Sequence, residues 1–219
     1  MKTRFSIPLC MLTLFLIVFT ACNDKQKQVA EDQSIKPKNE AAFKSGQKSV
    51  LIISSSPRRG GNSETLCQEF RKGAEEADHM VEMINLNDYD IRFYAQSEYN
   101  KEIEEEDDAI RIIRKMAAAD VIVLSTPVYF YNMTGQMKTL IDRVFKYEKE
   151  LQSKEFYYII TAADGPDALD ETIAGFRGFL RCLYNSWERG IVRGHGALER
   201  GDIDTKPAIR EAYEMGRSI

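Results

Sequence analysis

Residues 49–63 read SVLIISSSPRRGGNS, and this stretch determines how the rest of the chain is interpreted. Its first five residues form a nearly continuous apolar run, which is typical of a strand covered on both faces of a parallel sheet. The residues that follow combine hydroxyl side chains, two arginines and two glycines, and they end where a helical pattern begins. A buried strand, a polar turn and a helix in this order indicate an α/β domain.

The same alternation of short apolar runs and longer helical patterns continues to the end of the chain. It predicts strands at residues 50–54, 80–85, 121–125, 157–161 and 191–194. It predicts helices at residues 63–77, 105–119, 135–147, 168–188 and 207–217. Such βα units in series form a parallel sheet with helices on both faces. The economical arrangement is a flavodoxin-like three-layer α/β/α sandwich with a five-stranded parallel sheet of order 2-1-3-4-5.

The composition fits one globular domain and excludes several classes of protein. The chain has 219 residues, of which 43% are hydrophobic and 29% charged, a balance that supports a buried core. Its formal net charge is -4 and it has no long basic run, so nucleic acid is not expected as a partner. Four cysteines and two histidines leave little material for a metal site, and none is expected.

The N-terminus has the features of an export signal. Lys2 and Arg4 precede an apolar run over residues 7–19, which is shorter than the about 20 residues that a membrane span requires. Small residues then precede Cys22, a pattern that resembles the lipobox of bacterial lipoproteins and implies cleavage before Cys22 and a lipid on its sulfur. An uncleaved signal anchor is the alternative. We expect a signal peptide at 1–21, a lipidated flexible tether at 22–47 and the α/β domain at 48–219, in a protein of the bacterial cell envelope that is attached to a membrane through its lipid only.

Open parallel sheets bind ligands beyond the carboxyl ends of their strands, where the strand order reverses. The loop at residues 54–63 offers hydroxyls, arginines and helix N-terminal N–H groups, which together favour a phosphate cradle. It carries neither the P-loop nor the dinucleotide-binding pattern, and a serine-rich turn before an N-capped helix is the alternative.

Two further loops follow predicted strands at the same edge. Residues 126–135 contain three consecutive aromatics, Tyr129, Phe130 and Tyr131, of which at least one should face a ligand or a partner chain. A flat aromatic ligand fits this loop. The loop after the fourth strand contains Asp164 and Gly165, where the backbone can approach a ring edge, although taken singly this loop is better explained as a simple turn.

Taken in order, the motifs of these loops resemble one known family. They read SPR at 56–58, NSETL at 62–66, AD at 119–120, PVY at 127–129 and NMTG at 132–135, followed by Lys138 and DR at 142–143, and the similarity continues with GIV at 190–192 and ERGD at 199–202. In this order they resemble the NADPH-dependent FMN reductase family, and within it the flavodoxin-like branch that includes the iron-sulfur flavoproteins. The resemblance implies that Ser56, Arg58, Asn62 and Ser63 hold the FMN phosphate, that Pro127, Val128, Tyr129, Phe130 and Asn132 contact the ribityl chain and isoalloxazine, and that Asp164 and Gly165 lie near the ring.

One departure from that branch removes a second cofactor. Residues 89–97 contain no cysteine, where the iron-sulfur flavoproteins carry a compact group of them. Because cluster ligation requires several thiolates, no iron-sulfur cluster is expected in this loop. Phe93 and Tyr94 occupy this stretch instead. Three interpretations are open for them: they cover the flavin, they form a dimer contact, or they only pack the loop.

The resemblance also implies an activity. It implies an FMN-dependent NAD(P)H oxidoreductase of the quinone or flavin reductase type, with ping-pong hydride transfer through the flavin and NADPH or NADH as donor. The flavin carries the chemistry, so no side chain is expected as a catalytic acid, base or nucleophile. A quinone or flavin acceptor and a homodimer or tetramer are also implied. The alternatives are a non-enzymatic flavodoxin-like electron carrier or flavin-binding lipoprotein, and a scaffold without redox function.

The two cysteines of the domain raise the question of a disulfide, since export means an oxidising compartment. With the strand order above, Cys67 lies on a helix over one face of the sheet and Cys182 over the other. Their Cα atoms are then beyond the roughly 7 Å that a disulfide can bridge. We expect two free thiols, with Cys67 buried beside Phe70 and Ala74.

Overall fold

The computed structural model describes residues 44–95 and 107–219 of the chain. The expected signal peptide, Cys22 and nearly all of the expected tether lie outside the described residues. No helix within these described ranges is both long and apolar enough to cross a membrane.

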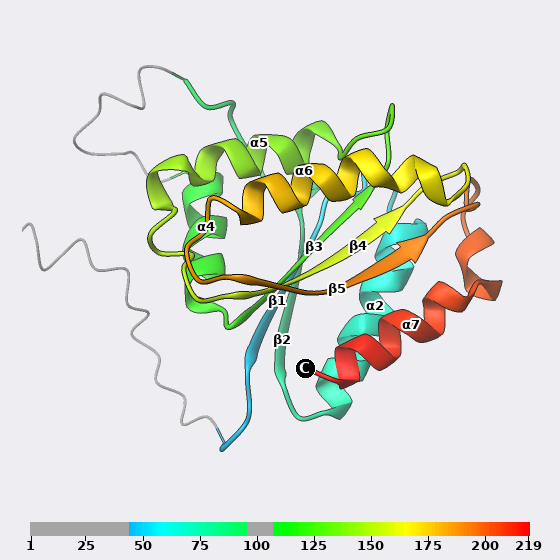
Figure 1. Ribbon diagram of the computed structural model, residues 1–219, viewed down its shortest axis with the longest axis horizontal. Helices are drawn as coiled ribbons and strands as arrows, with labels where there is room; N and C mark the ends of the chain where they lie inside the picture. The colour runs from blue at the N-terminus through cyan, green and yellow to red at the C-terminus, as the bar shows by residue number, and fades with distance from the viewer. Residues whose placement is uncertain (1–43, 96–106) are drawn as a thin grey trace, which may run out of the picture. The chain divides into compact units, whose positions relative to one another are not determined.

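A five-stranded sheet forms the centre of the domain (Figure 1). Its strands are β1 (Ser49–Ser54), β2 (Met80–Asn85), β3 (Val121–Pro127), β4 (Glu155–Thr161) and β5 (Trp187–Gly194). They are arranged in the order β2-β1-β3-β4-β5, and every pairing is parallel. This order confirms the expected flavodoxin-like fold.

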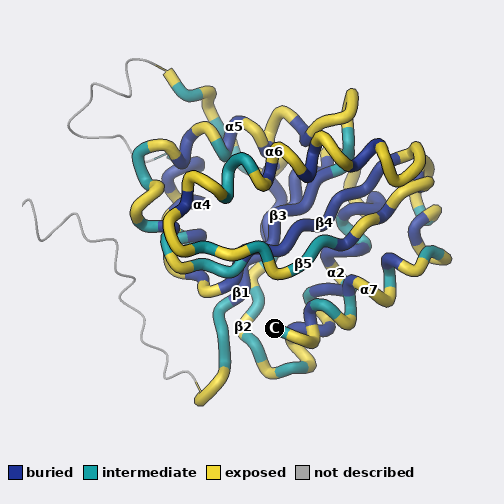
Figure 2. The backbone as a smooth tube through the Cα atoms, in the orientation of Figure 1, coloured by how far each residue is buried: buried dark blue, intermediate teal, exposed yellow. Residues whose placement is uncertain are grey.

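The helices cover the sheet in two layers. Helices α2 (Asn62–Glu76) and α7 (Pro207–Arg217) lie on one face, and α4 (Asp108–Ala118), α5 (Gly135–Arg143) and α6 (Asp170–Leu180) lie on the other (Figure 1). Side chains along β1 alternate between two separate cores, with Val50 and Ile52 under α2 and Leu51 and Ile53 under the opposite layer. The central strands are therefore buried on both faces, as Figure 2 shows in dark blue.

Helices α2 and α7 pack with their backbones in contact. A Cβ atom at Gly216 would lie 2.0 Å from the Phe70 carbonyl oxygen, and one at Gly73 would lie 2.1 Å from the Tyr213 carbonyl oxygen. Only glycine fits at these two positions, because the opposing atoms belong to backbone that cannot turn aside. The contact fixes the C-terminal helix against α2, the helix whose N-terminus begins the candidate site.

The boundary between the fourth helix and the fifth strand differs from the expected one. Helix α6 ends at Leu180 rather than at residue 188, and β5 begins at Trp187 rather than at residue 191. Asn185 has φ +52°, which is incompatible with a continuing helix, and Trp187 N–H donates to the Lys154 carbonyl at 3.0 Å. Pairing with β4 therefore outweighs the helical periodicity of this stretch. Helix α5 is also shorter than expected, and a 3-10 turn, η2 (Val144–Tyr147), completes it.

Both cysteines of the domain are free thiols, as expected. Cys67 is fully buried on α2 and belongs to the same core cluster as Phe70, whereas Cys182 is exposed just after α6 on the opposite face. Burial raises the pKa of the Cys67 thiol to about 12, so this side chain stays protonated at physiological pH.

Candidate functional site

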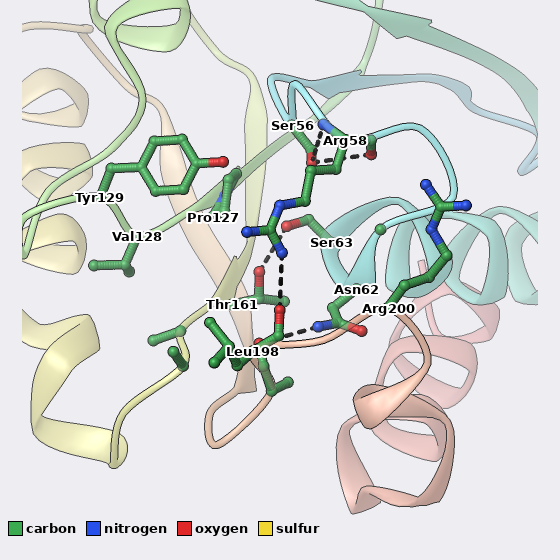
Figure 3. A pocket seen from close by; sticks show the side chains of 14 residues that line it. Ser56, Arg58, Asn62, Ser63, Pro127, Val128, Tyr129, Thr161, Leu198 and Arg200 are labelled. Atoms are coloured by element: carbon green, nitrogen blue, oxygen red, sulfur yellow. Dashed lines mark hydrogen bonds between the residues drawn. The ribbon is translucent and has the colours of Figure 1, made fainter.

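A cavity of about 160 Å³ lies at the carboxyl ends of β1, β3 and β4 (Figure 3). The strand order reverses here, since β2 lies on one side of β1 and β3 on the other. Four segments form its wall: the loops after β1 and β3, the end of β4 with the loop after it, and the segment after β5. The lining residues are Ser56, Arg58, Gly61, Asn62, Ser63, Pro127, Val128, Tyr129, Thr161, Ala162, Ala163, Ala197, Leu198 and Arg200.

The charge of this cavity is suited to an anion. Among the described lining residues there are two arginines, Arg58 and Arg200, and no carboxylate. The first turn of α2 faces the same place, and its N-cap residue, Gly61, has no side chain to accept from the N–H groups of that turn. Helix N-termini with unpaired N–H groups bind phosphate readily.

Glycines shape the turn that leads into α2. Gly60 has φ +61°, a backbone conformation that residues with a Cβ rarely adopt. A Cβ at Gly61 would lie 3.0 Å from the Arg58 carbonyl oxygen, so a side chain there would crowd the turn. The two glycines thus allow the backbone to double back and present its N–H groups to the cavity.

The side chains of Asn62 and Ser63 are already engaged within the protein. Asn62 Nδ2 donates to the carbonyl oxygens of Ala197 at 3.0 Å and Glu199 at 2.9 Å. Ser63 Oγ lies 2.6 Å from Thr161 Oγ1. Both side chains therefore hold the cavity walls together, and their backbone N–H groups remain for a ligand.

Arg58 and Ser56 occupy the opposite side of the cradle. Arg58 Nη1 donates to the Leu198 carbonyl at 2.9 Å, which holds the guanidinium across the cavity, as Figure 3 shows. Ser56 Oγ accepts from Arg58 N–H at 3.3 Å. The Ser56 carbonyl points to the other side, where it accepts from Asn87 Nδ2 at 2.5 Å and Asn85 Nδ2 at 3.3 Å. These two asparagines, at and after the end of β2, fix the orientation of the loop although they do not line the cavity.

The aromatic loop after β3 is a tight hairpin. Tyr129 N–H donates to the Asn132 carbonyl at 2.9 Å, and Asn132 N–H donates back at 3.1 Å. At its tip, Phe130 and Tyr131 have φ +50° and +61°, which is strained for bulky residues. The tip projects into solvent, and the Phe130 side chain is fully exposed. Thr134 N–H donates to Thr126 Oγ1 at 3.0 Å and closes the loop at its base.

The structure brings together most of the residues expected to bind FMN. Those lining the cavity are Ser56, Arg58, Asn62, Ser63, Pro127, Val128 and Tyr129. Phe130 projects outward, Asn132 lines a neighbouring groove, and Asp164 and Gly165 are exposed beside the cavity without lining it. Sequence reasoning assigned no role to Ala197, Leu198 and Arg200, since only folding brings the segment after β5 to α2.

The neighbouring groove is larger, about 780 Å³, and mostly apolar. It lies between α5 and α6, and its wall includes Met133, Phe179 and Cys182. Phe93 and Tyr94 also line it, and the Tyr94 ring meets the Phe145 ring edge-on at 5.9 Å between centroids. The two aromatics of the loop after β2 therefore lie on this groove and do not line the cavity.

A sheet of order 2-1-3-4-5 with an anion cradle at its reversal point defines a flavodoxin-like α/β protein. Within that class the chain belongs to the NADPH-dependent FMN reductase family, whose sequence model matches residues 49–183. Membership agrees with the expected FMN-dependent NAD(P)H oxidoreductase, with FMN as cofactor and NADH or NADPH as donor.

Relatives agree with this family. An iron-sulfur flavoprotein of Archaeoglobus fulgidus is 29% identical over 181 residues, which cover 76% of this chain and 80% of that protein. A second, from Methanocaldococcus jannaschii, is 36% identical over 97 residues, 43% of this chain and half of that protein. An FMN-dependent NADH:quinone oxidoreductase of Pseudomonas aeruginosa is 28% identical over 114 residues, 46% of this chain and 56% of that protein.

A solved structure supports the fold. The NAD(P)H:quinone oxidoreductase from Methanothermobacter marburgensis superimposes with a TM-score of 0.64 over 79% of this chain and 96% of that chain. The two are 18% identical, so this likeness concerns the fold alone.

Proposed function

We propose that this protein is an envelope-anchored FMN reductase that passes electrons from NADH or NADPH to a quinone or flavin acceptor by ping-pong exchange at one site. The observation that carries the proposal is the acid-free cavity with Arg58 and Arg200 in its wall and the uncapped N-terminus of α2 beside it. An anionic phosphate satisfies both, since it accepts from N–H groups and neutralises the arginines.

The size of the cavity indicates how FMN lies in it. About 160 Å³ is well below the roughly 300–1,000 Å³ of a complete small-molecule pocket. We therefore place the phosphate and the start of the ribityl chain inside, and the isoalloxazine ring across the opening. Val128, Tyr129, Ala162 and Ala163, which line the cavity, would contact the ring there.

In this arrangement the protein binds and orients FMN, and the bound FMN would supply the hydride chemistry. Arg58 and the first turn of α2 hold the phosphate end. The Asn85 and Asn87 amides keep the Ser56 loop in one conformation, and Thr126 keeps the aromatic loop closed. Because the ring would lie at the open side, donor and acceptor could reach it in turn, which is what ping-pong exchange requires.

A second copy of the chain would complete the site. Tyr129, Phe130 and Tyr131 are 42%, 102% and 58% exposed, a cluster of large apolar surface beside the opening. Exposed aromatic clusters of this kind mark interaction surfaces. The backbone strain at Phe130 and Tyr131 is not offset by burial of the Phe130 side chain against the described residues. We infer a homodimer or tetramer in which this hairpin contacts the neighbouring subunit and shields the ring from water.

The membrane attachment rests on the sequence alone. The pattern of Lys2, Arg4, an apolar run and Cys22 supports cleavage at residue 21 and lipidation of Cys22, which would hold the domain on a tether at a bacterial membrane. Metabolic labelling with a radioactive fatty acid tests this. The wild-type chain should incorporate label, and Cys22→Ala should incorporate none.

Absorption spectroscopy tests the activity. The full chain is purified in detergent, incubated with FMN, desalted and treated with NADPH without air. If the flavin is retained, loses its absorption with NADPH and regains it when a quinone is added, the result supports the reductase. Retained flavin that stays oxidised favours the electron carrier, and loss of all flavin on desalting argues against the cradle formed by Arg58 and α2.

A further inference from the structure

Arg200 lines the cavity from a segment that the family motifs do not assign to the cofactor. It lies between the end of β5 and the 3-10 turn η4 (Asp202–Thr205), more than a hundred residues after Arg58 in the chain. In Figure 3 the two arginine side chains reach the cradle from different elements, Arg58 from the loop after β1 and Arg200 from the segment after β5.

The backbone on both sides of Arg200 is fixed to the cradle itself. Asn62 Nδ2 donates to the carbonyls of Ala197 and Glu199, and the Leu198 carbonyl accepts from Arg58 Nη1. The segment is also held internally, because Asp202 Oδ2 accepts from Leu198 N–H at 3.0 Å and from Glu199 N–H at 2.8 Å. The base of the Arg200 side chain is therefore held in place relative to α2.

The guanidinium of Arg200, in contrast, has no polar partner in the part of the chain that the structure describes. It makes no hydrogen bond or ion pair with any residue among 44–95 and 107–219. Its Cζ and Nε atoms lie 4.0 Å from the position that a Cβ of Gly60 would take, directly over the glycine turn. The carboxylate of Asp202, on the same loop, is already used by two backbone N–H groups.

We propose that Arg200 is a second cationic contact for the phosphate of FMN and that it makes the site select FMN over riboflavin. The inference rests on the proposed function and adds a residue to it. A flavin phosphate carries nearly two negative charges at pH 7, more than Arg58 alone neutralises. Arg200 supplies the second positive charge from the other side of the glycine turn, and its donors are available because no group in the described part of the chain uses them.

The comparison of two flavins tests this. FMN and riboflavin share the ring and the ribityl chain, and only FMN has the phosphate, so their affinity ratio isolates the phosphate contacts. Dissociation constants are measured by flavin fluorescence quenching for the full chain in detergent, for Arg200→Gln and for Arg200→Lys. The matched control is Arg210→Gln, which removes an equal charge from an exposed position on α7.

We expect Arg200→Gln to weaken FMN binding about tenfold or more, as for loss of a charged hydrogen bond, and to leave riboflavin binding within twofold of wild type. Arg200→Lys should recover part of the FMN affinity, and Arg210→Gln should change neither. Raising the salt concentration should weaken FMN binding less in Arg200→Gln than in wild type, because one screened charge is gone.

Two results would overturn the inference. Equal weakening of FMN and riboflavin would mean that Arg200 only shapes the wall, and unchanged FMN affinity would mean that it is simply solvated. Either result leaves the proposed function standing if the wild-type chain binds FMN. A wild-type chain that retains no FMN overturns the proposed function and this inference together.

Discussion

Ser63 Oγ and Thr161 Oγ1 lie 2.6 Å apart, and this hydrogen bond joins the first turn of α2 to the end of β4 directly under the cavity. Both residues are almost completely buried. The bond therefore sets the distance between two walls of the site that are separated by 98 residues in the chain.

Removing both partners of this pair should cost less than the sum of the two single removals. Ser63→Ala leaves the buried Thr161 hydroxyl without a partner, so we expect the free energy of unfolding to fall by about 1–3 kcal/mol. Thr161→Val should cost a similar amount. The double variant should be closer to wild type than the sum of the two, as urea denaturation of all four proteins would show. Strict additivity would mean that the two hydroxyls do not depend on each other.

The contact between α2 and α7 gives a second prediction. At Gly216 a methyl group would lie 2.0 Å from the Phe70 carbonyl oxygen, so Gly216→Ala must separate the two helices. We expect a loss of about 3 kcal/mol or more, and in a marginal domain loss of folding. The matched control is Gly178→Ala on α6, where the nearest atom is the flexible end of Arg181 at 3.7 Å. Because alanine favours a helix, that variant should be stabilised by up to about 1 kcal/mol in thermal unfolding.

The sequence predicts the sheet better than the site. Apolar runs such as residues 50–53 and 121–124 are long enough to identify the central strands, since they fit only where both faces of the sheet are covered. The role of Arg200 depends instead on contacts between Asn62 and residues 197 and 199, which no local pattern records. The start of β5 at Trp187 was missed for the same reason, because pairing with β4 decides it.

Asp107 gives the stability of the domain a component that depends on pH. Burial alone would raise the pKa of this carboxyl, but hydrogen bonds from Arg143 and the Ile110 N–H, with the charges of Arg143 and Arg92, hold the pKa below its usual value. A lowered folded-state pKa contributes stability above the unfolded value of about 4, and that stability is lost as pH falls through the folded pKa.

Asp107→Asn isolates this charge, since asparagine also caps a helix and Asp107 is the N-cap of α4. The variant removes the carboxylate that lies 2.7 Å from the buried Arg143 Nη1, so we expect it to lose roughly 3 kcal/mol at pH 7. Urea denaturation at several pH values should show this deficit shrinking below pH 4, as the wild-type carboxyl becomes protonated. A deficit that stays constant from pH 7 to pH 3 would contradict a role for the charge.

The strained tip of the hairpin after β3 is also the surface proposed to contact a neighbouring subunit. Phe130 and Tyr131 adopt positive φ with their side chains exposed, a backbone that an Asn-Gly pair adopts without strain. Replacing both, as Phe130→Asn with Tyr131→Gly, should stabilise the isolated subunit by about 1–2 kcal/mol and weaken the proposed dimer or tetramer. Light scattering over a range of concentrations and thermal unfolding measure the two effects on the same samples.

The control is Tyr184→Ser, which removes an aromatic side chain that is 77% exposed at another place on the surface, and it should change neither stability nor assembly. A variant that assembles like wild type would mean that this strained tip serves the flavin site alone, because an interface built on two aromatic side chains does not survive their removal.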